Sequence, residues 1–592
     1  MLHALKTVFI FFISISVYSQ SFVYSKNYFR WPVQVKPGIV ANFGELREGH
    51  WHMGLDIRTD HKVNTPVYAA AEGYIARVSV HAFGYGQAIY INHPNGLTTV
   101  YGHLNKFFPA LDSFVKLQQY RQESWDIELE FSKNELPVKK GQFIALSGST
   151  GSSQGPHVHF EIRDTKTERC INPLLFDLPV ADAVAPVFTK LAMYNRNLSV
   201  YDQSPALFTV NRRGDKYSVK PELIRTGFAR LSFAVGAYDC VTGSTNRNGI
   251  YSGEIFFDGQ RLIEFVLDSM DYIETEYVNA HVDYKYKYNG GIYLQQLFQL
   301  PGDHGRAYKP QNSNGTIVLK DTNVHSVRIE ARDVFNNMSE LTFKLQYSDR
   351  LARAAGSGSG SDFPPNEVNV FERDDFEVYL PEHCLYDSIP PSFSQQKQPQ
   401  LSAVSPEFRF GDPSIPFYGK INIRIKPSRP ITDNLKSRVV IKRTDKKSVS
   451  FRVATWQMDW LAAGFSDFGS YCAFVDSELP VVNDLAKGDT IDLSSSKNIV
   501  FYPKDNSGVR TFTAELDGKW LRFTNDKGAA WIYTFDERCS YGTHLLKIKI
   551  EDLVGNITEK EWWFRRLPYQ PPAKKKSHTG TKRSGKTKLQ KK

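Results

Sequence analysis

Apolar and polar residues alternate with a period of two along much of this chain. The alternation is clear in residues 73–78, 87–91 and 97–101, and the PNG segment at 94–96 is a typical hairpin turn. Successive side chains of a strand leave opposite faces, so this pattern predicts strands that bury one face. We therefore expect a mainly β protein with an antiparallel sheet near its amino terminus.

One segment departs from this alternation. Between residues 107 and 126, Leu111, Phe114 and Val115 fall at mixed helical spacing, and the segment contains no glycine. We predict a helix inserted there into the β domain, followed by a strand near 127–131. Such a helix could form one wall of a substrate groove, or it could cover the outer face of the sheet.

The second half of the chain contains an internal repeat. Residues 325–337 (HSVRIEARDVFNN) match residues 545–556 (LLKIKIEDLVGN), and each copy is an alternating strand that ends in a D-x-x-[NG]-N turn. Repeats of strand and turn resemble immunoglobulin-like β-sandwiches of bacterial surface and periplasmic proteins. We therefore expect Ig-like β domains at 187–348 and 485–568.

The length of 592 residues suggests about three to five domains. Residues 366–484 form another β-rich domain in this interpretation, with no chemistry that we can identify. A flexible linker is expected at 349–365, because this segment contains the run AAGSGSGS.

Residues 1–19 have the composition of a signal peptide. Lys6 precedes an apolar run that is too short to span a membrane and ends in small or modest residues. We expect export to the periplasm or cell envelope. No later stretch approaches 18 consecutive apolar residues, so no transmembrane segment is expected in the mature chain.

The carboxyl-terminal tail, 569–592, is strongly basic. Nine Lys and Arg and no acid lie between Ala573 and Lys592, so the rest of the chain carries about 10 − 9 = +1 of the net charge of +10. We predict a disordered tail that could contact an anionic surface or have no specific use. Nucleic acid is not an expected partner, because an exported protein rarely meets it.

The five cysteines are far apart in the sequence, so there is no CxxC motif for a metal or for redox chemistry. Export permits disulfides, and Cys384 could pair with Cys472, but buried free thiols are an equal alternative.

Candidate chemistry is concentrated near the amino terminus, where eight of the 15 histidines lie between His50 and His159. His157 and His159 occur in a segment of strand-forming residues, so both rings should leave the same face. His52 and Asp56 are four residues apart, roughly 13 Å on a straight strand, and could share an ion only if the chain turns. Imidazole and carboxylate ligands are typical of a Zn²⁺ site that keeps one position open.

Three motifs in order resemble those of the lysostaphin-like (LytM-type) zinc endopeptidases, which cut peptide cross-bridges in peptidoglycan. They are HMGLD at 52–56, YGHL at 101–104 and GSTGSSQGPHVHFEIR at 148–163. The resemblance covers about residues 29–176, and we expect a LytM-type domain at 29–179 that folds by itself.

The resemblance implies a role for five residues. His52, Asp56 and His159 would bind one Zn²⁺, and His103 and His157 would be the catalytic histidines. Which of these two is the general base stays open, and His50 is assigned to the rim of the site instead of to the metal.

The expected function is therefore an exported zinc metalloendopeptidase that hydrolyses peptide cross-links of peptidoglycan. An alternative is a non-catalytic scaffold that uses a peptidase-like domain to bind peptidoglycan or to activate an amidase. A weaker alternative is a metallopeptidase that acts on exported proteins.

Overall fold

The computed structural model describes residues 24–214, 216–352, 363–397, 402–528 and 530–568. The expected signal peptide, most of the expected linker and the basic tail lie outside these residues. Strands make up 46% of the structure and helices 9%, which confirms the prediction of a mainly β protein.

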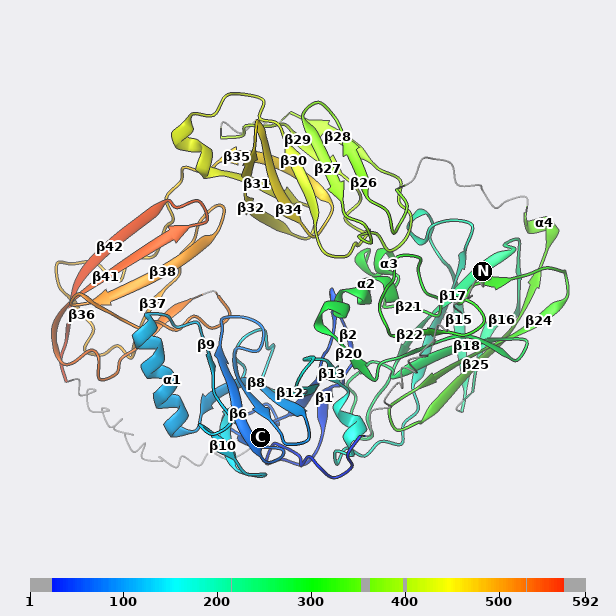
Figure 1. Cartoon of the computed structure of the whole chain (residues 1–592), viewed down its shortest axis with the longest axis horizontal. Helices are drawn as coiled ribbons and strands as arrows, with labels where there is room; N and C mark the ends of the chain where they lie inside the picture. The colour runs from blue at the N-terminus through cyan, green and yellow to red at the C-terminus, as the bar shows by residue number, and fades with distance from the viewer. Residues whose placement is uncertain (1–23, 215, 353–362, 398–401, 529, 569–592) are drawn as a thin grey trace, which may run out of the picture.

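The amino-terminal domain is built on one antiparallel sheet with the strand order β1-β4-β12-β8-β7-β6-β10 (Figure 1). Shorter strands extend this sheet at its margins, and a small β2–β3 ribbon lies beside it. The elements are β1 (Ile39–Ala41), β2 (Leu46–Arg47), β3 (His50–Trp51), β4 (Leu55–Arg58), β5 (Pro66–Tyr68), β6 (Gly73–Val80), β7 (Gln87–Asn92), β8 (Leu97–Phe107), α1 (Pro109–Gln122), β9 (Ile127–Glu130), β10 (Pro137–Val138), β11 (Phe143–Ser147), β12 (His157–Asp164), β13 (Cys170–Ile171), the 3₁₀ turn η1 (Pro173–Phe176) and β20 (Ser269–Met270).

Strand β12 shows why the sheet has two different faces. Val158, Phe160 and Ile162 are fully buried in the domain core, as their alternation predicts. The intervening residues, among them His159 and Glu161, leave the opposite face, where polar side chains gather.

The second domain contains an 11-stranded sheet in the order β21-β17-β14-β15-β16-β25-β24-β18-β19-β22, with β23 paired to β17. Its elements are β14 (Val187–Asn195), η2 (Val200–Asp202), β15 (Ala206–Arg213), β16 (Lys216–Thr226), β17 (Arg230–Tyr238), β18 (Ser252–Phe257), β19 (Gln260–Val266), η3 (Tyr272–Tyr277), α2 (Val278–His281), α3 (Tyr284–Tyr288), β21 (Gln295–Gln296), β22 (Tyr308–Pro310), β23 (Ile317–Val318), β24 (Val324–Arg332), β25 (Met338–Tyr347) and α4 (Asp349–Ala352).

The third domain consists of two five-stranded sheets, and the fourth of a five-stranded sheet and a two-stranded one. The third domain contains β26 (Asn369–Glu372), β27 (Phe376–Leu380), β28 (Phe393–Gln396), β29 (Glu407–Phe410), β30 (Ile421–Ile425), η4 (Asp433–Arg438), β31 (Val439–Thr444), β32 (Val449–Val453), β33 (Thr455–Gln457), β34 (Trp460–Phe465) and β35 (Gly469–Val475). The fourth contains β36 (Ile491–Asp492), β37 (Asn498–Phe501), β38 (Val509–Leu516), β39 (Lys519–Trp520), β40 (Trp531–Thr534), β41 (Gly542–Asp552) and β42 (Ile557–Arg566).

The two copies of the sequence repeat adopt the same local structure. Each forms an antiparallel hairpin, β24–β25 in the second domain and β41–β42 in the fourth. A third strand pairs with the first strand of each hairpin, β18 in one domain and β38 in the other. The strand–turn–strand prediction is confirmed for both copies.

The first and second domains are packed closely against each other. Strand β20, which follows β19 in the second domain, pairs with β13 and so joins the sheet of the first domain. Trp51 and Met53 of the first domain are buried in the same apolar cluster as residues of the second and third domains. The first domain thus has a core of its own, and part of its surface is buried against the second domain.

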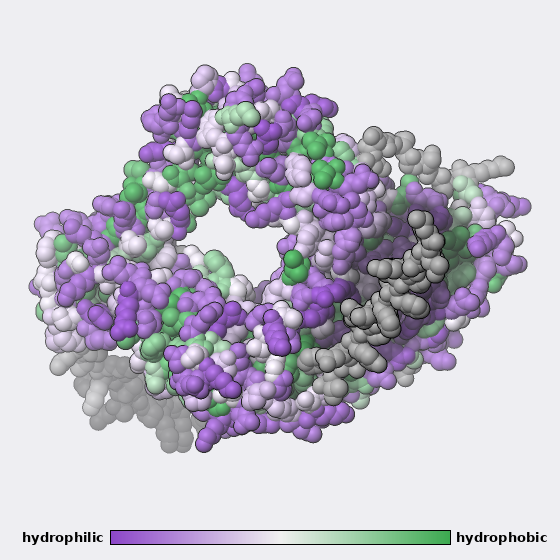
Figure 2. Space-filling model, in the orientation of Figure 1, coloured by the Kyte–Doolittle hydropathy of each residue, from purple (hydrophilic) through white to green (hydrophobic). Residues whose placement is uncertain are grey.

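The four domains are arranged around a central opening, which Figure 2 shows passing through the molecule. The fourth domain closes this ring by packing on α1 of the first. Lys116 donates to Asp536 over 2.7 Å, and the rings of Tyr120 and Trp520 meet edge to face at 5.3 Å. The inserted helix therefore has a contact that neither interpretation of its sequence anticipated.

All five cysteines are free thiols, including Cys384 and Cys472, so the structure contains no disulfide between these two. Among the described residues, no helix has both the length and the apolar character needed to cross a membrane.

Candidate metal centre

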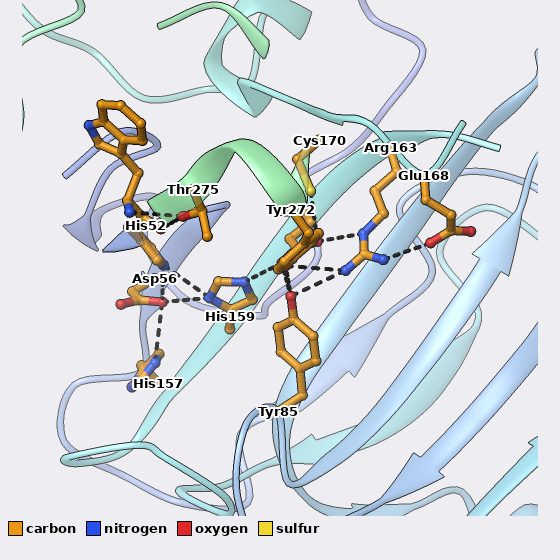
Figure 3. A network of polar contacts seen from close by, with 12 residues as sticks. His52, Asp56, Tyr85, His157, His159, Arg163, Glu168, Cys170, Tyr272 and Thr275 are labelled. Carbon is orange, nitrogen blue, oxygen red and sulfur yellow. Dashed lines mark hydrogen bonds and ion pairs between the residues drawn. The ribbon is translucent and has the colours of Figure 1, made fainter. Parts of the chain in front are cut away.

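Three polar side chains converge on one point of the first domain (Figure 3). His52 Nε2, Asp56 Oδ1 and His159 Nδ1 lie 3.0 Å from one another in each of the three pairs. All three residues are buried, with between 2% and 5% of their surface exposed. These are the three residues that the sequence motifs select as metal ligands, and the structure brings them together.

Strand pairing explains how these residues meet. His159 on β12 pairs directly with Asp56 on β4, so their side chains share one face of the sheet. The chain bends at Gly54, which brings His52 back over Asp56. A Cβ at Gly54 would lie 2.6 Å from the carbonyl oxygen of Phe160 and 2.9 Å from His159 Nε2. The expected turn is present, and glycine is needed there because β12 passes so closely.

The side-chain nitrogen and oxygen atoms that face away from the common point form further hydrogen bonds. His52 Nδ1 donates to the carbonyl oxygen of Asn42 over 2.7 Å, so Nε2 is left without its proton. Asp56 Oδ2 accepts a hydrogen bond from Arg47 at 2.5 Å. His159 Nε2 donates to Glu161 Oε1 over 2.8 Å.

Glu161 is the centre of a second polar group behind His159. Its fully buried carboxylate accepts from Arg163 Nε at 2.7 Å and from the Tyr272 hydroxyl at 2.7 Å. The Tyr85 hydroxyl donates to the same carboxylate, in a short contact. Tyr272 lies on η3, so the second domain contributes directly to this site. The sequence motifs assign no role to these residues, although Glu161 and Arg163 belong to the third motif.

His103 and His157 lie next to the three converging groups. Their ring centroids are 4.8 Å apart, and His157 Nε2 is 3.3 Å from Asp56 Oδ1. His103 Nδ1 donates to the carbonyl oxygen of Thr150 over 2.8 Å, and His157 Nδ1 donates to that of Gly155 over 2.8 Å. Both rings therefore present an unprotonated Nε2 when they are neutral.

The backbone at His103 is unusual, with a φ of 58° in the left-handed region. The pairing of β8 with β7 and with β11 shifts register close to this residue. Non-glycine residues seldom adopt this conformation, and irregularities of this kind redirect a side chain. Here the irregularity places the His103 ring beside His157.

Burial and neighbouring charges shift the pKa values of the site. Burial lowers the pKa of His52 to about 4, and burial with the nearby His159 and His157 lowers that of His103 to about 3. Burial also acts to lower the pKa of His159, but hydrogen bonds to Asp56 and Glu161 raise it to about 9. Burial acts to raise the pKa of Asp56, and the surrounding histidines hold it well below its usual range.

Two other histidines lie apart from this group. His50 is exposed on β3, and its Nδ1 contacts the carbonyl oxygen of Glu48 at 3.0 Å. His93 is buried, and its ring nitrogens contact Glu72 O and Thr99 Oγ1 at 2.7 and 2.8 Å. His93 therefore supports the fold beneath the hairpin turn.

The donor set fits a zinc ion. Two imidazole nitrogens and one carboxylate oxygen are a ligand set used by catalytic zinc sites, in which a fourth position stays open. Ligand atoms bound tetrahedrally at about 2.0–2.1 Å lie about 3.3–3.4 Å apart, close to the 3.0 Å observed here. His159 Nε2 also donates a hydrogen bond to the buried carboxylate of Glu161. Hydrogen bonds of this kind orient metal-binding histidines in many proteins.

Comparison with known families shows which family the first domain resembles. Residues 50–120 and 128–173 match the family described as "Peptidase family M23". The chain contains a peptidase family M23 domain. A separate match covers residues 361–476, which correspond to a "Zu5-like domain" and include the third domain.

Several curated proteins resemble the M23 domain. An "Uncharacterized metalloprotease" of Haemophilus influenzae is 33% identical over 163 residues, which are 26% of this chain and 28% of that protein. The "DD-carboxypeptidase/endopeptidase Mpg" of Neisseria meningitidis is 33% identical over 131 residues, 22% of this chain and 24% of Mpg. The "Peptidoglycan DD-endopeptidase ShyB" of Vibrio cholerae is 32% identical over 134 residues, 23% of this chain and 25% of ShyB. The chain thus spans about a quarter of the length of these relatives.

Solved structures also resemble this region. A zinc-containing peptidase from Vibrio cholerae is 28% identical, with a TM-score of 0.20, over 26% of this chain and 41% of that one. The catalytic domain of lysostaphin from Staphylococcus simulans is 26% identical, with a TM-score of 0.18, over 24% of this chain and 90% of that one.

Proposed function

We propose that this protein is an exported zinc endopeptidase that hydrolyses peptide cross-links of peptidoglycan in the periplasm or cell envelope. The observation that supports it most is the convergence of His52 Nε2, Asp56 Oδ1 and His159 Nδ1 beside two further histidines. Relatives of the M23 domain include proteins named as peptidoglycan DD-endopeptidases, which suggests the substrate class.

In this proposal His52, Asp56 and His159 bind the zinc ion. When bound, Zn²⁺ supplies a Lewis acid that polarises the scissile carbonyl group and lowers the pKa of an attacking water. Asp56 is ionised at neutral pH because its pKa is held well below the usual range, so it can act as an anionic ligand. Arg47 and Glu161 orient Asp56 and His159 from behind.

His103 and His157 would carry the protons of the reaction. Their Nδ1 atoms are engaged with backbone carbonyl oxygens, so Nε2 of either ring is available to accept a proton from water. The same nitrogen, once protonated, can donate to the oxyanion or to the leaving amine. The lowered pKa of His103 keeps this ring neutral at physiological pH.

Six variants of the full chain test this assignment. His52→Ala, Asp56→Ala and His159→Ala should lose zinc and activity, because two remaining ligands do not complete the coordination shell. His103→Ala and His157→Ala should keep nearly one zinc per chain while turnover falls about 10²–10⁴-fold. His50→Ala is the control and should retain both zinc and activity.

The measurements are zinc content by elemental analysis and hydrolysis of purified peptidoglycan, with released fragments identified by mass spectrometry. Loss of zinc in His157→Ala with retention in His159→Ala would reverse the two assignments. If the unmodified protein binds zinc but releases nothing from any peptidoglycan, the scaffold alternative holds instead.

A further inference from the structure

A cluster of three carboxylates lies where the chain enters the second domain. Asp182 belongs to the connection before β14, Asp239 follows β17, and Asp333 begins the turn of the β24–β25 hairpin. One oxygen from each of the three lies within 4.8 Å of the other two.

A second cluster has the same construction where the chain enters the fourth domain. Asp476 lies in the connection after β35, Asp505 precedes β38, and Asp552 ends β41 at the hairpin turn. One oxygen from each of these three also lies within 4.8 Å of the others.

One asparagine makes the same pair of contacts in each cluster. Asn337 donates its amide to Asp333 and to the carbonyl oxygen of Asp182, at 2.6 and 3.4 Å. Asn556 donates to Asp552 and to the carbonyl oxygen of Asp476, at 2.7 and 3.3 Å. In both domains, the D-x-x-[NG]-N turn of the sequence repeat therefore contacts the incoming connection.

Several buried oxygens in these clusters have no hydrogen-bond partner. In the first cluster these are Asp182 Oδ2 and Asp239 Oδ1, and Asp239 is only 3% exposed. Both side-chain atoms of Asn248, whose backbone pairs with that of Asp239, also lack a partner.

The second cluster likewise contains three acceptors without a hydrogen-bond partner. Asp476 Oδ2, Asp505 Oδ2 and Asn556 Oδ1 have no hydrogen-bond partner, although Asp476 is 1% exposed and Asn556 is 2% exposed. Within the described parts of the chain, no Lys, Arg or His forms an ion pair with any of the six carboxylates.

Buried acceptors without a donor and buried charges without a counter-charge are both unfavourable. In the first cluster, burial together with the charges of Asp182 and Asp333 raises the pKa of Asp239 to about 7. A cation bound among the three carboxylates would remove this repulsion and satisfy the free oxygens. Carboxylate, amide and carbonyl oxygens are the ligands that Ca²⁺ prefers, and Ca²⁺ tolerates irregular geometry.

We propose that the two aspartate clusters are equivalent calcium sites, one at each junction where a connecting segment enters a repeated β domain. Because Asp182 and Asp476 belong to the connecting segments, each bound ion holds a connection against the domain that follows it. Calcium would thereby fix the orientation of neighbouring domains. This inference is independent of the proposed peptidase activity.

The test is calcium titration of the full chain in calcium-free buffer, by calorimetry and by thermal unfolding. The unmodified protein should bind two calcium ions and unfold at a higher temperature in about 1 mM Ca²⁺, the range of extracellular calcium modules. Asp239→Asn and Asp505→Asn should each remove one site, and the double variant should bind none. Asparagine keeps the shape of the side chain and removes a repelling charge, so these variants should fold.

Asp321→Asn and Asp492→Asn are matched controls, because both change exposed carboxylates of the same two domains outside the clusters. They should bind two calcium ions.

If circular dichroism shows that a cluster variant is unfolded, Asp182→Asn or Asp476→Asn, in the connecting segment of the same cluster, replaces it. Absence of calcium binding by the unmodified chain, or unchanged binding by the double variant, would overturn the proposal. Equal thermal protection by Mg²⁺ would overturn the assignment to calcium.

Discussion

At the scale of single residues, Glu161 connects the candidate metal centre to the rest of the protein. Its carboxylate accepts from His159 on one side and from Arg163 and Tyr272 on the other. The neighbouring positive charges outweigh the effect of burial and lower the pKa of Glu161 to about 2. A fully ionised carboxylate behind His159 increases the electron density that the ring offers to a metal.

Glu161→Gln should therefore weaken zinc binding by about 10- to 100-fold, the usual effect of losing a hydrogen-bonded partner of a metal-binding histidine. Zinc affinity would be measured by competition with a chromogenic chelator. Tyr272→Phe is the matched control, because it removes one hydrogen bond to Glu161 and leaves the carboxylate in place. Equal affinity of Glu161→Gln and the unmodified protein would show that Glu161 has a structural role only.

At the scale of elements, the loop between β11 and β12 connects the fourth domain to the two histidines that we propose as catalytic, His103 and His157. Carbonyl oxygens of this loop accept the Nδ1 protons of His103 and His157. The fourth domain contacts the same loop, because Asp526 accepts from the backbone nitrogen of Gly151 at 2.7 Å. Lys527 donates to the carbonyl oxygen of Ser153 in a short contact.

Asp526→Ala should reduce kcat about fivefold with zinc content unchanged. The loss of one hydrogen bond is worth about 1 kcal/mol, and it would let the loop move away from the position that orients the two rings. Glu537→Ala is the control, since it removes an ion pair of the same interface with Lys116, outside the loop. Equal kcat values for Asp526→Ala and the unmodified protein would argue against this positioning role.

At the scale of the whole molecule, the first domain depends on the second. Trp51 is 2% exposed, its backbone nitrogen donates to Thr275, and its ring lies 5.5 Å from that of His281. Strand β20 adds hydrogen bonds to the edge of the first sheet at β13. A break at residue 179 would expose this surface, so we expect a fragment that ends there to fold with lower stability than the intact unit.

A chain that ends at residue 179 should therefore unfold at a lower temperature than one that ends at residue 352. Exposure of each large apolar side chain, such as Trp51 or Met53, costs about 1.5–3 kcal/mol. Thermal unfolding of the two fragments, with zinc content measured in parallel, tests this expectation. Identical unfolding temperatures would show that the second domain adds nothing to the stability of the first.

The basic tail leads to a separate expectation about the whole chain. Deletion of residues 573–592 removes nine positive charges and should weaken binding to anionic vesicles at low salt. The difference should shrink near 0.15 M salt, where the Debye length is about 8 Å. Equal binding of both forms at low salt would exclude a role for the tail in surface attachment.

Local patterns in the sequence were sufficient to predict much of this protein. Alternation predicts the strands of the first domain and of both repeats, because the two faces of a strand differ at every second residue. The same rule places His157 and His159 on one face, and both rings do reach the same oxygen of Asp56. The order and spacing of the three motifs indicated the peptidase family, which the family comparison supports.

Other features depend on contacts between residues that are far apart in the sequence, and no local pattern reports such contacts. The hydrogen bond of Tyr272 to Glu161 joins residues 111 positions apart, and that of Asp526 to Gly151 joins residues 375 apart. The same holds for the two aspartate clusters, since each carboxylate comes from a different segment. Sequence determined which strands form and which residues could bind a metal. Tertiary structure alone decided which distant side chains lie behind the candidate metal centre and at the domain junctions, because burial and packing bring those segments together.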